Sequence, residues 1–164
     1  MVRPVVDATM CYIRYMGEAL FIHRTKGEED MHNGFFVPPG GRTEQGERGI
    51  DGILREFQEE TGLELEDPKL RVIALFDNVG RTFNGKPAEK DWRVQVYEAR
   101  VFSGVLREEH PKAMPMWVPD REIGGLKMHE GDRKILDLLD HGGVFEVRTR
   151  YNGEDLTSFD VTEV

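Results

Sequence analysis

One segment, Gly41 to Leu63, constrains the fold of this chain more than any other, and it reads GRTEQGERGIDGILREFQEETGL. Its apolar residues are spaced by three and four positions, and they are Ile50, Ile53, Leu54 and Phe57. This spacing predicts one buried face of a helix from about Arg48 to Glu60. Gly62 is a typical helix stop, because glycine adopts the left-handed conformation easily.

The same helix carries a strip of acids beside its buried face. With Ile50 set at 0°, the 3.6-residue turn places Glu56, Glu59 and Glu60 at about 240°, 180° and 280°. Gly49 and Gly52 fall on the same strip, where they leave space for a close approach. A solvated acidic face is the alternative interpretation. The glycines, the preceding Pro-Pro-Gly-Gly turn and Glu47 favour a cation site instead, since oxygen-only clusters suit Mg²⁺ or Mn²⁺.

The rest of the chain contains more predicted strands than helices. Strands are expected at Val5–Tyr15, Ala19–Arg24, Asp67–Asp77, Trp92–Phe102, Val144–Tyr151 and Leu156–Val161, with an extended stretch at Gly34–Pro39. The first two are expected to form a hairpin, as are the last two around Asn152-Gly153. A late helix is expected at Gly131–Leu139. This mixture indicates an α/β or α+β protein.

Composition limits the class of protein. The chain has 164 residues, 22 Lys and Arg against 31 Asp and Glu, and a formal net charge of −9. Its length predicts a single domain over residues 1–164. The negative charge argues against stable nucleic-acid binding, because Lys and Arg supply most of that affinity. One cysteine, Cys11, predicts no disulfide and no Cys-rich zinc site. Neither a membrane span nor a signal peptide is evident, so we expect a cytoplasmic protein.

The acidic segment resembles the Nudix box, Gx5Ex7REUxEExGU, where U is a bulky apolar residue. Gly41, Glu47 and the run from Arg55 to Leu63 occupy every fixed position of that pattern. The resemblance implies a Nudix hydrolase with the Nudix fold. That fold is a mixed β-sheet core sandwiched between helices, in which the box forms a loop–helix–loop.

The resemblance also implies roles for the residues of the box. Glu56, Glu59 and Glu60 match the metal-binding and catalytic glutamates, and the carbonyl of Gly40 or Gly41 is a further ligand. Arg55 matches the arginine that holds these glutamates by ion pairing. Glu47 matches a glutamate that is structural or binds the metal through water. The general base is a glutamate of the cluster or of a distant loop. Glu108 and Glu109 are the nearest candidates for the loop glutamate that supplies a metal ligand in related enzymes.

The whole chain is similar to MutT-type diphosphatases, which convert oxidised purine nucleoside triphosphates to the monophosphate and pyrophosphate. The similarity implies that Gly41 and Arg24 face the nucleotide and that Trp117 lies beside the cleft. Val37 falls where that group has a purine-reading asparagine, so Asn33 is the substitute candidate. Those enzymes read the oxidised base with a pair of acidic residues. The corresponding positions here are Glu130 and Gly131, so one acid remains, and Asp132 is adjacent.

Two alternatives stay open. In the first alternative, the protein is a Nudix hydrolase whose substrate is another nucleoside diphosphate derivative, such as ADP-ribose, a dinucleoside polyphosphate or a nucleotide sugar. The other alternative is a Nudix domain that senses a ligand without catalysis, which the complete box disfavours. A small-molecule nucleotide substrate, no membrane association, and a monomer or homodimer are expected throughout.

Overall fold

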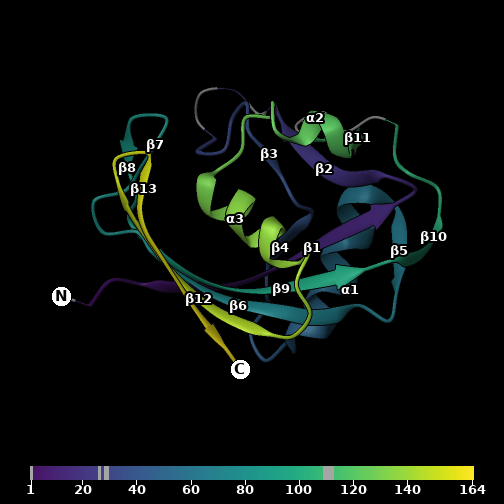
Figure 1. Cartoon of the computed structure of the whole chain (residues 1–164), viewed down its shortest axis with the longest axis horizontal. Helices are drawn as coiled ribbons and strands as arrows, with labels where there is room; N and C mark the ends of the chain where they lie inside the picture. Colours follow the sequence, from purple (N-terminus) through teal and green to yellow (C-terminus); the bar gives the residue numbers. More distant parts are fainter. Residues whose placement is uncertain (1, 26, 28–29, 109–112) are drawn as a thin grey trace.

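The computed structural model describes residues 2–25, 27, 30–108 and 113–164. Its framework is a curved, mixed sheet of nine strands with the order β11-β2-β1-β9-β6-β12-β13, while β3 pairs with β2 and β4 pairs with β1 (Figure 1). The strands are β1 (Val5–Tyr15), β2 (Glu18–Arg24), β3 (Phe36–Val37), β4 (Gly40–Arg42), β6 (Lys69–Asp77), β9 (Asp91–Ala99), β11 (Ala113–Pro119), β12 (Phe145–Asn152) and β13 (Asp155–Glu163). The pairs β1–β9 and β12–β6 are parallel and the others are antiparallel, which confirms the predicted mixed sheet.

Helices cover both faces of the sheet. Helix α1 (Gly49–Thr61) packs on one face, and α3 (Glu130–Leu138) packs on the other, with the short α2 (Asp120–Ile123) after β11 (Figure 1). Each face has its own apolar cluster, one around Ile53 and Phe57 of α1 and one around Ile135 and Leu136 of α3. This arrangement confirms the predicted Nudix fold. Among the described residues, no helix is long and apolar enough to cross a membrane.

The buried face of α1 differs in one position from the prediction. Ile53 and Phe57 are fully buried, but Leu54 is 37% exposed. Gly52 is buried in its place, because the loop before α1 brings Thr43 and Glu47 against it. The buried face is therefore rotated toward the acidic strip, and α1 ends at Gly62 with a φ of 80°, as predicted for its stop.

Both predicted hairpins form, since β1 pairs with β2 and β12 pairs with β13. The predicted strand Trp92–Phe102 is wrong in its length. β9 ends at Ala99, and a separate strand β10 (Val101–Gly104) leaves the main sheet to pair with β5 (Leu63–Glu66). The strand predicted from Asp67 begins only at Lys69, because Asp67 lies in a turn with a φ of 48°.

Five of the strands in the described residues were not expected from the sequence. Two are β4 and β5, which flank α1, and a third is β11, which forms one edge of the sheet. The other two form the small hairpin of β7 (Thr82–Phe83) and β8 (Lys86–Pro87). The hairpin lies in the connection between β6 and β9, around the Asn84-Gly85 turn. It bears on function because this connection lines the cavity described below.

Candidate active site

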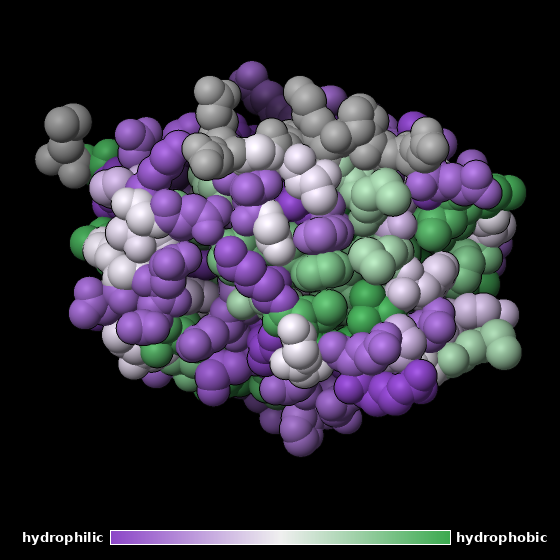
Figure 2. Space-filling view, turned by 90° about the horizontal axis from the view of Figure 1, so that it is seen from above, coloured by the Kyte–Doolittle hydropathy of each residue, from purple (hydrophilic) through white to green (hydrophobic). Residues whose placement is uncertain are grey.

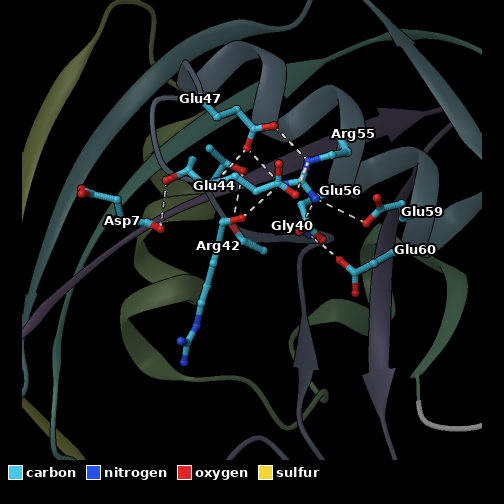
Figure 3. Close-up of polar contacts among 12 residues, drawn as sticks. Asp7, Gly40, Arg42, Glu44, Glu47, Arg55, Glu56, Glu59 and Glu60 are labelled. Atoms are coloured by element: carbon cyan, nitrogen blue, oxygen red, sulfur yellow. Dashed lines mark hydrogen bonds and ion pairs between the residues drawn. The ribbon is translucent and has the colours of Figure 1, made fainter.

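The guanidinium of Arg55 lies at the centre of an acidic cluster formed by α1 and the loop after β4 (Figure 3). Its Nε and Nη2 donate to the two carboxylate oxygens of Glu47, both at 2.9 Å, in bidentate geometry. Its Nη1 donates to Glu56 at 2.8 Å and to Glu59 at 3.4 Å. The Arg55 fork, helped by the backbone N–H of Glu44, lowers the pKa of Glu47 to about 2. Arg55 therefore holds Glu47 and orients Glu56 and Glu59.

Two glycines bring strand β4 against these acids. A Cβ atom on Gly41 would lie 2.5 Å from Cδ of Glu56, and one on Gly40 would collide with the backbone of Thr9. The backbone N–H of Gly40 donates to Oε1 of Glu60 at 2.7 Å. Only glycine permits this approach, so strand β4 places backbone oxygens and side-chain carboxylates in one region.

The donor set of this region fits a hard divalent cation. Every candidate ligand is an oxygen, from Glu56, Glu59, Glu60 or the backbone of Gly40 and Gly41. In the part of the chain that the structure describes, no three acidic, histidine or cysteine side chains point to a common centre. Oxygens of Glu60, Glu56 and Glu59 that a cation would bind accept hydrogen bonds from Gly40 and Arg55.

A cavity of about 420 Å³ opens on the other side of β4, on the α3 face of the sheet. Gly40 and Gly41 form part of its wall, so it adjoins the acidic cluster. Its floor is apolar and comes from Met10, Phe76, Trp92 and Val94. Arg24 lies at the end of β2 in the wall, where it forms an ion pair with Asp30 at 3.1 Å.

The far end of the cavity holds a buried acid and a buried cation. Asp132 of α3 is 8% exposed, and burial raises its pKa to about 6. Arg81 is 5% exposed, donates to Oδ1 of Asn78 at 3.1 Å, and stacks on Tyr151 and Phe83. Both side chains line the cavity, and the positive charge of Arg81 offsets part of the rise in the pKa of Asp132. A ligand there meets an acceptor and a donor on an apolar floor.

Comparison with known proteins identifies the family. The NUDIX domain matches residues 4–139, which is most of the chain. The chain belongs to the Nudix family. It is therefore a Nudix hydrolase by family, and Nudix hydrolases generally use divalent cations.

Relatives and solved structures agree with this assignment. The uncharacterized Nudix hydrolase YvcI of Bacillus subtilis is 27% identical over 82% of this chain and 78% of its own length. A MutT protein from Bacillus halodurans superimposes with a TM-score of 0.79 at 23% identity, covering 95% of this chain and 97% of its own. A MutT protein from Methanosarcina mazei gives a TM-score of 0.68 at 21% identity, over 85% and 96% of the two chains. These structures establish the shared fold.

Three residues predicted to bind substrate do not line the cavity of this Nudix protein. Glu130 is exposed, and Asp132 faces inward because two residues along a helix turn the side chain by about 200°. Asn33 instead accepts a hydrogen bond from the backbone N–H of Gly27 at 3.0 Å. Glu108 is exposed on the loop after β10, and Glu109 lies outside the described residues.

Trp117 is the third of these residues. Its ring packs on Phe102 and Tyr15 beside the α1 cluster, and it borders a separate hollow between β11 and α2. Hydrophobic side chains gather on this face of the molecule among hydrophilic ones (Figure 2), and Met114 and Met116 of β11 are both exposed. Trp117 therefore packs against the α1 cluster, whereas Trp92 lines the cavity.

Sequence reasoning missed several residues that the fold brings to the cavity. They are Asn78, Arg81 and Phe83 from the β6–β9 connection, and His32 and His129. The two histidines join their segments through a contact of 2.9 Å between Nδ1 of His32 and Nε2 of His129. The Asn84-Gly85 dipeptide is a turn signal within the β6–β9 connection, but it does not indicate which side chains face the cavity.

Replacing Arg55 with alanine is expected to lower both stability and activity of this Nudix protein. The change leaves Glu47, Glu56 and Glu59 without the cation that separates them and without the charge-assisted hydrogen bonds that orient them. We expect a melting temperature several degrees lower and at least about tenfold weaker cation binding. Arg48→Ala is the matched control, because its ion pair with Asp51 is exposed. Unchanged melting temperature and cation affinity in Arg55→Ala would contradict the orienting role.

Proposed function

We propose that this chain is a Mg²⁺-dependent pyrophosphohydrolase, with Mn²⁺ accepted, that converts purine nucleoside triphosphates, oxidised ones above all, to the monophosphate and pyrophosphate. One observation carries the proposal. A cavity with an apolar floor, a buried carboxyl group and a buried guanidinium adjoins strand β4, whose glycines face the box glutamates. The base then occupies the cavity, and the phosphates extend past Gly40 and Gly41 toward α1. The earlier expectations of cytoplasmic action and of a monomer or homodimer remain part of this proposal.

The box residues divide the chemistry between them. The cation would be held by Glu56, Glu59, Glu60 and a backbone oxygen of Gly40 or Gly41, and it would neutralise the phosphates and polarise phosphorus. Arg55 keeps the glutamates in place through its contacts with Glu47 and Glu56. One carboxylate of the cluster accepts the proton of the attacking water.

The cavity supplies the recognition of the base. A 6-oxopurine presents acceptors at O6 and N7 and a donor at N1–H on its edges, and Arg81 and Asp132 provide the complementary groups. In an 8-oxidised purine, N7 becomes an N–H donor in place of the acceptor, and O8 is a new acceptor. Asp132 takes the part that the sequence suggested for Glu130, and Trp92 and Phe76 provide the apolar contact surface.

The substrate proposal predicts a clear ranking of nucleotides. We expect 8-oxo-dGTP or dGTP to exceed dATP, dCTP, ADP-ribose and diadenosine polyphosphates in kcat/KM by at least about tenfold, which is roughly 1.4 kcal/mol. The measurement combines steady-state kinetics with identification of the products as monophosphate and pyrophosphate. If a dinucleoside polyphosphate or ADP-ribose has the highest kcat/KM, the substrate belongs to that alternative class and is not a purine nucleoside triphosphate.

Matched variants then test the base reader. Asp132→Asn keeps the size of the side chain and alters its hydrogen-bonding pattern, so the purine preference is expected to fall by about 10²-fold. Glu130→Gln, two residues away and exposed, is expected to leave that preference unchanged. Equal effects of the two variants would exclude Asp132 as the residue that reads the base.

A capped RNA is tested alongside the nucleotides named above. Over 61 residues, or 37% of this chain, the protein is 38% identical to a Xenopus laevis relative named m7GpppN-mRNA hydrolase NUDT17, and that match spans 20% of the relative. The name describes the relative, and the short match favours no such activity here. Hydrolysis of the capped RNA in preference to free nucleotides would overturn the proposed substrate class.

A further inference from the structure

We propose that Asn78 is a positioning residue, which fixes the direction in which Arg81 presents its N–H groups to the base of the nucleotide. The inference rests on the proposed function, in which Arg81 contacts the base, and it adds the residue that makes this contact selective. Asn78 directly follows β6, and it lines the cavity together with Arg81.

Aromatic rings hold the guanidinium of Arg81 but do not fix its direction. Its Cζ atom lies 3.7 Å from the centre of the Tyr151 ring and 4.2 Å from the centre of the Phe83 ring. Such contacts keep a guanidinium against the face of a ring, and they oppose rotation within its own plane only weakly, because a ring face has no directional acceptor. Stacking alone therefore leaves open which N–H groups of Arg81 point into the cavity.

Asn78 supplies the directional contact that the rings lack. Its Oδ1 accepts a hydrogen bond from Nη1 of Arg81 at 3.1 Å. Within the described part of the chain, this is the one hydrogen bond that the Arg81 side chain donates, and no ion pair accompanies it. A guanidinium carries five N–H donors in one plane, so fixing one of them sets the direction of the others.

Asn78 is itself anchored to the backbone at the start of β9. Its Nδ2 donates to the carbonyl of Lys90 at 3.0 Å, and its backbone N–H donates to Oδ1 of Asp91 at 2.9 Å. The side chain is fully buried. Since the next residue, Trp92, belongs to the cavity floor, Asn78 connects the direction of Arg81 to the position of that floor.

The chemistry of the two partners requires an amide at position 78. A guanidinium only donates and a backbone carbonyl only accepts, so the group between Arg81 and Lys90 must offer one acceptor and one donor. The same two partners settle which way the Asn78 amide points. Aspartate would keep the acceptor for Arg81 and lose the donor, and leucine would lose both.

Direction decides which purine Arg81 favours. A 6-oxopurine presents an acceptor at O6, whereas a 6-aminopurine presents a donor at N6 in its place. A guanidinium held in one direction is matched to the first pattern and leaves an unpaired donor against the second. A guanidinium that turns in its plane reaches other acceptors, and the discrimination falls.

The first test measures base preference without turnover, as the ratio of the Kd values for dAMP and dGMP in calorimetric titrations. Asn78→Leu is expected to lower this ratio by about tenfold, and to leave the affinity for deoxyribose 5-phosphate, which has no base, unchanged. Asn78→Asp keeps the acceptor and is expected to retain most of the preference. In an Arg81→Leu background, Asn78→Leu is expected to have no further effect on the ratio.

Gln95→Leu is the matched control, because it also exchanges an amide for an apolar group. Gln95 lies on the α1 face of β9, where its Oε1 accepts a hydrogen bond from the Tyr97 hydroxyl at 2.7 Å. It is expected to leave the ratio unchanged. An unchanged ratio in Asn78→Leu, or an equal loss in Gln95→Leu, would overturn the proposal. So would a loss in Asn78→Leu that persists in the Arg81→Leu background, since Asn78 would then act on the cavity by another route.

The second test needs no ligand and separates this inference from the proposed function. With arginine labelled by ¹⁵N, restricted rotation is expected to give Arg81 separate Nη–H signals, which merge in Asn78→Leu and stay separate in Asn78→Asp and Gln95→Leu. If the unmodified protein binds dGMP and dAMP equally, the proposed base recognition fails, yet merged signals in Asn78→Leu still support the positioning role. Separate signals in Asn78→Leu would overturn that role, and if this variant does not fold, merged signals in Asn78→Asp would overturn it.

Discussion

Replacing Glu60 or Glu59 with glutamine is expected to lower kcat by at least about 100-fold while the protein stays folded. Glutamine keeps the shape of the side chain and removes the negative charge that a cation or a proton requires. In Glu60→Gln, the side-chain amide oxygen still accepts the hydrogen bond that the backbone N–H of Gly40 donates to Glu60. The Glu59 side chain is 55% exposed, so its replacement opens no cavity in the core.

The variants are compared by steady-state kinetics and by thermal unfolding. Glu64→Gln is the control, because Glu64 is an exposed acid on β5, directly after the helix, and its loss changes the net charge by the same amount. It is expected to leave kcat within about twofold of the original value. Near-normal kcat in both Glu59→Gln and Glu60→Gln would remove these residues from the reaction. A variant that fails to fold would instead assign them a structural role.

The acidic cluster was predictable because its pattern is local. Glu56, Glu59 and Glu60 lie within about one turn of a single helix, so the helical period alone brings them to one strip. Gly40 and Gly41 precede that helix by a short loop, and their role depends on close approach that only glycine allows. The family resemblance added the roles of these residues, and the fold of the whole chain followed from the resemblance.

The cavity was harder to predict because its position depends on register and on a long connection. Glu130 and Asp132 differ by two residues, yet about 200° of helical rotation puts one in solvent and the other in the cavity. In β11, Trp117 faces the α1 cluster while its neighbour Val118 joins the α3 cluster. A one-residue difference in a strand changes the face.

Arg81 illustrates a second reason why the cavity could not be predicted from the sequence. It follows β6 in a connection whose sequence has no periodicity, and its surroundings come from residues far apart in the chain. Tyr151 of β12 lies beneath its guanidinium, and Phe83 of β7 stacks on it as well. Nothing local to the sequence around residue 81 indicates that these rings converge there.

Removing divalent cations is expected to abolish turnover completely, and returning Mg²⁺ or Mn²⁺ is expected to restore it. Five glutamates lie around the single cation Arg55, namely Glu44, Glu47, Glu56, Glu59 and the neighbouring Glu60. This excess of negative charge repels a nucleoside triphosphate, and only a cation between the two groups allows them to meet. If the activity in excess EDTA equals the activity in Mg²⁺, the metal-dependent mechanism is ruled out.

Cation binding has a readout that needs no substrate. A ligand that binds only the folded state stabilises it, and Mg²⁺ at roughly ten times its Kd is expected to raise the melting temperature by about 3–6 °C. Relief of repulsion among the box carboxylates is the physical source of this gain. Glu56→Gln and Glu60→Gln are expected to lose most of the rise, because each removes a charge from the cluster, whereas Glu64→Gln is expected to keep it. If all three variants show the full rise, Mg²⁺ binds elsewhere on this acidic chain, and the box glutamates do not form its site.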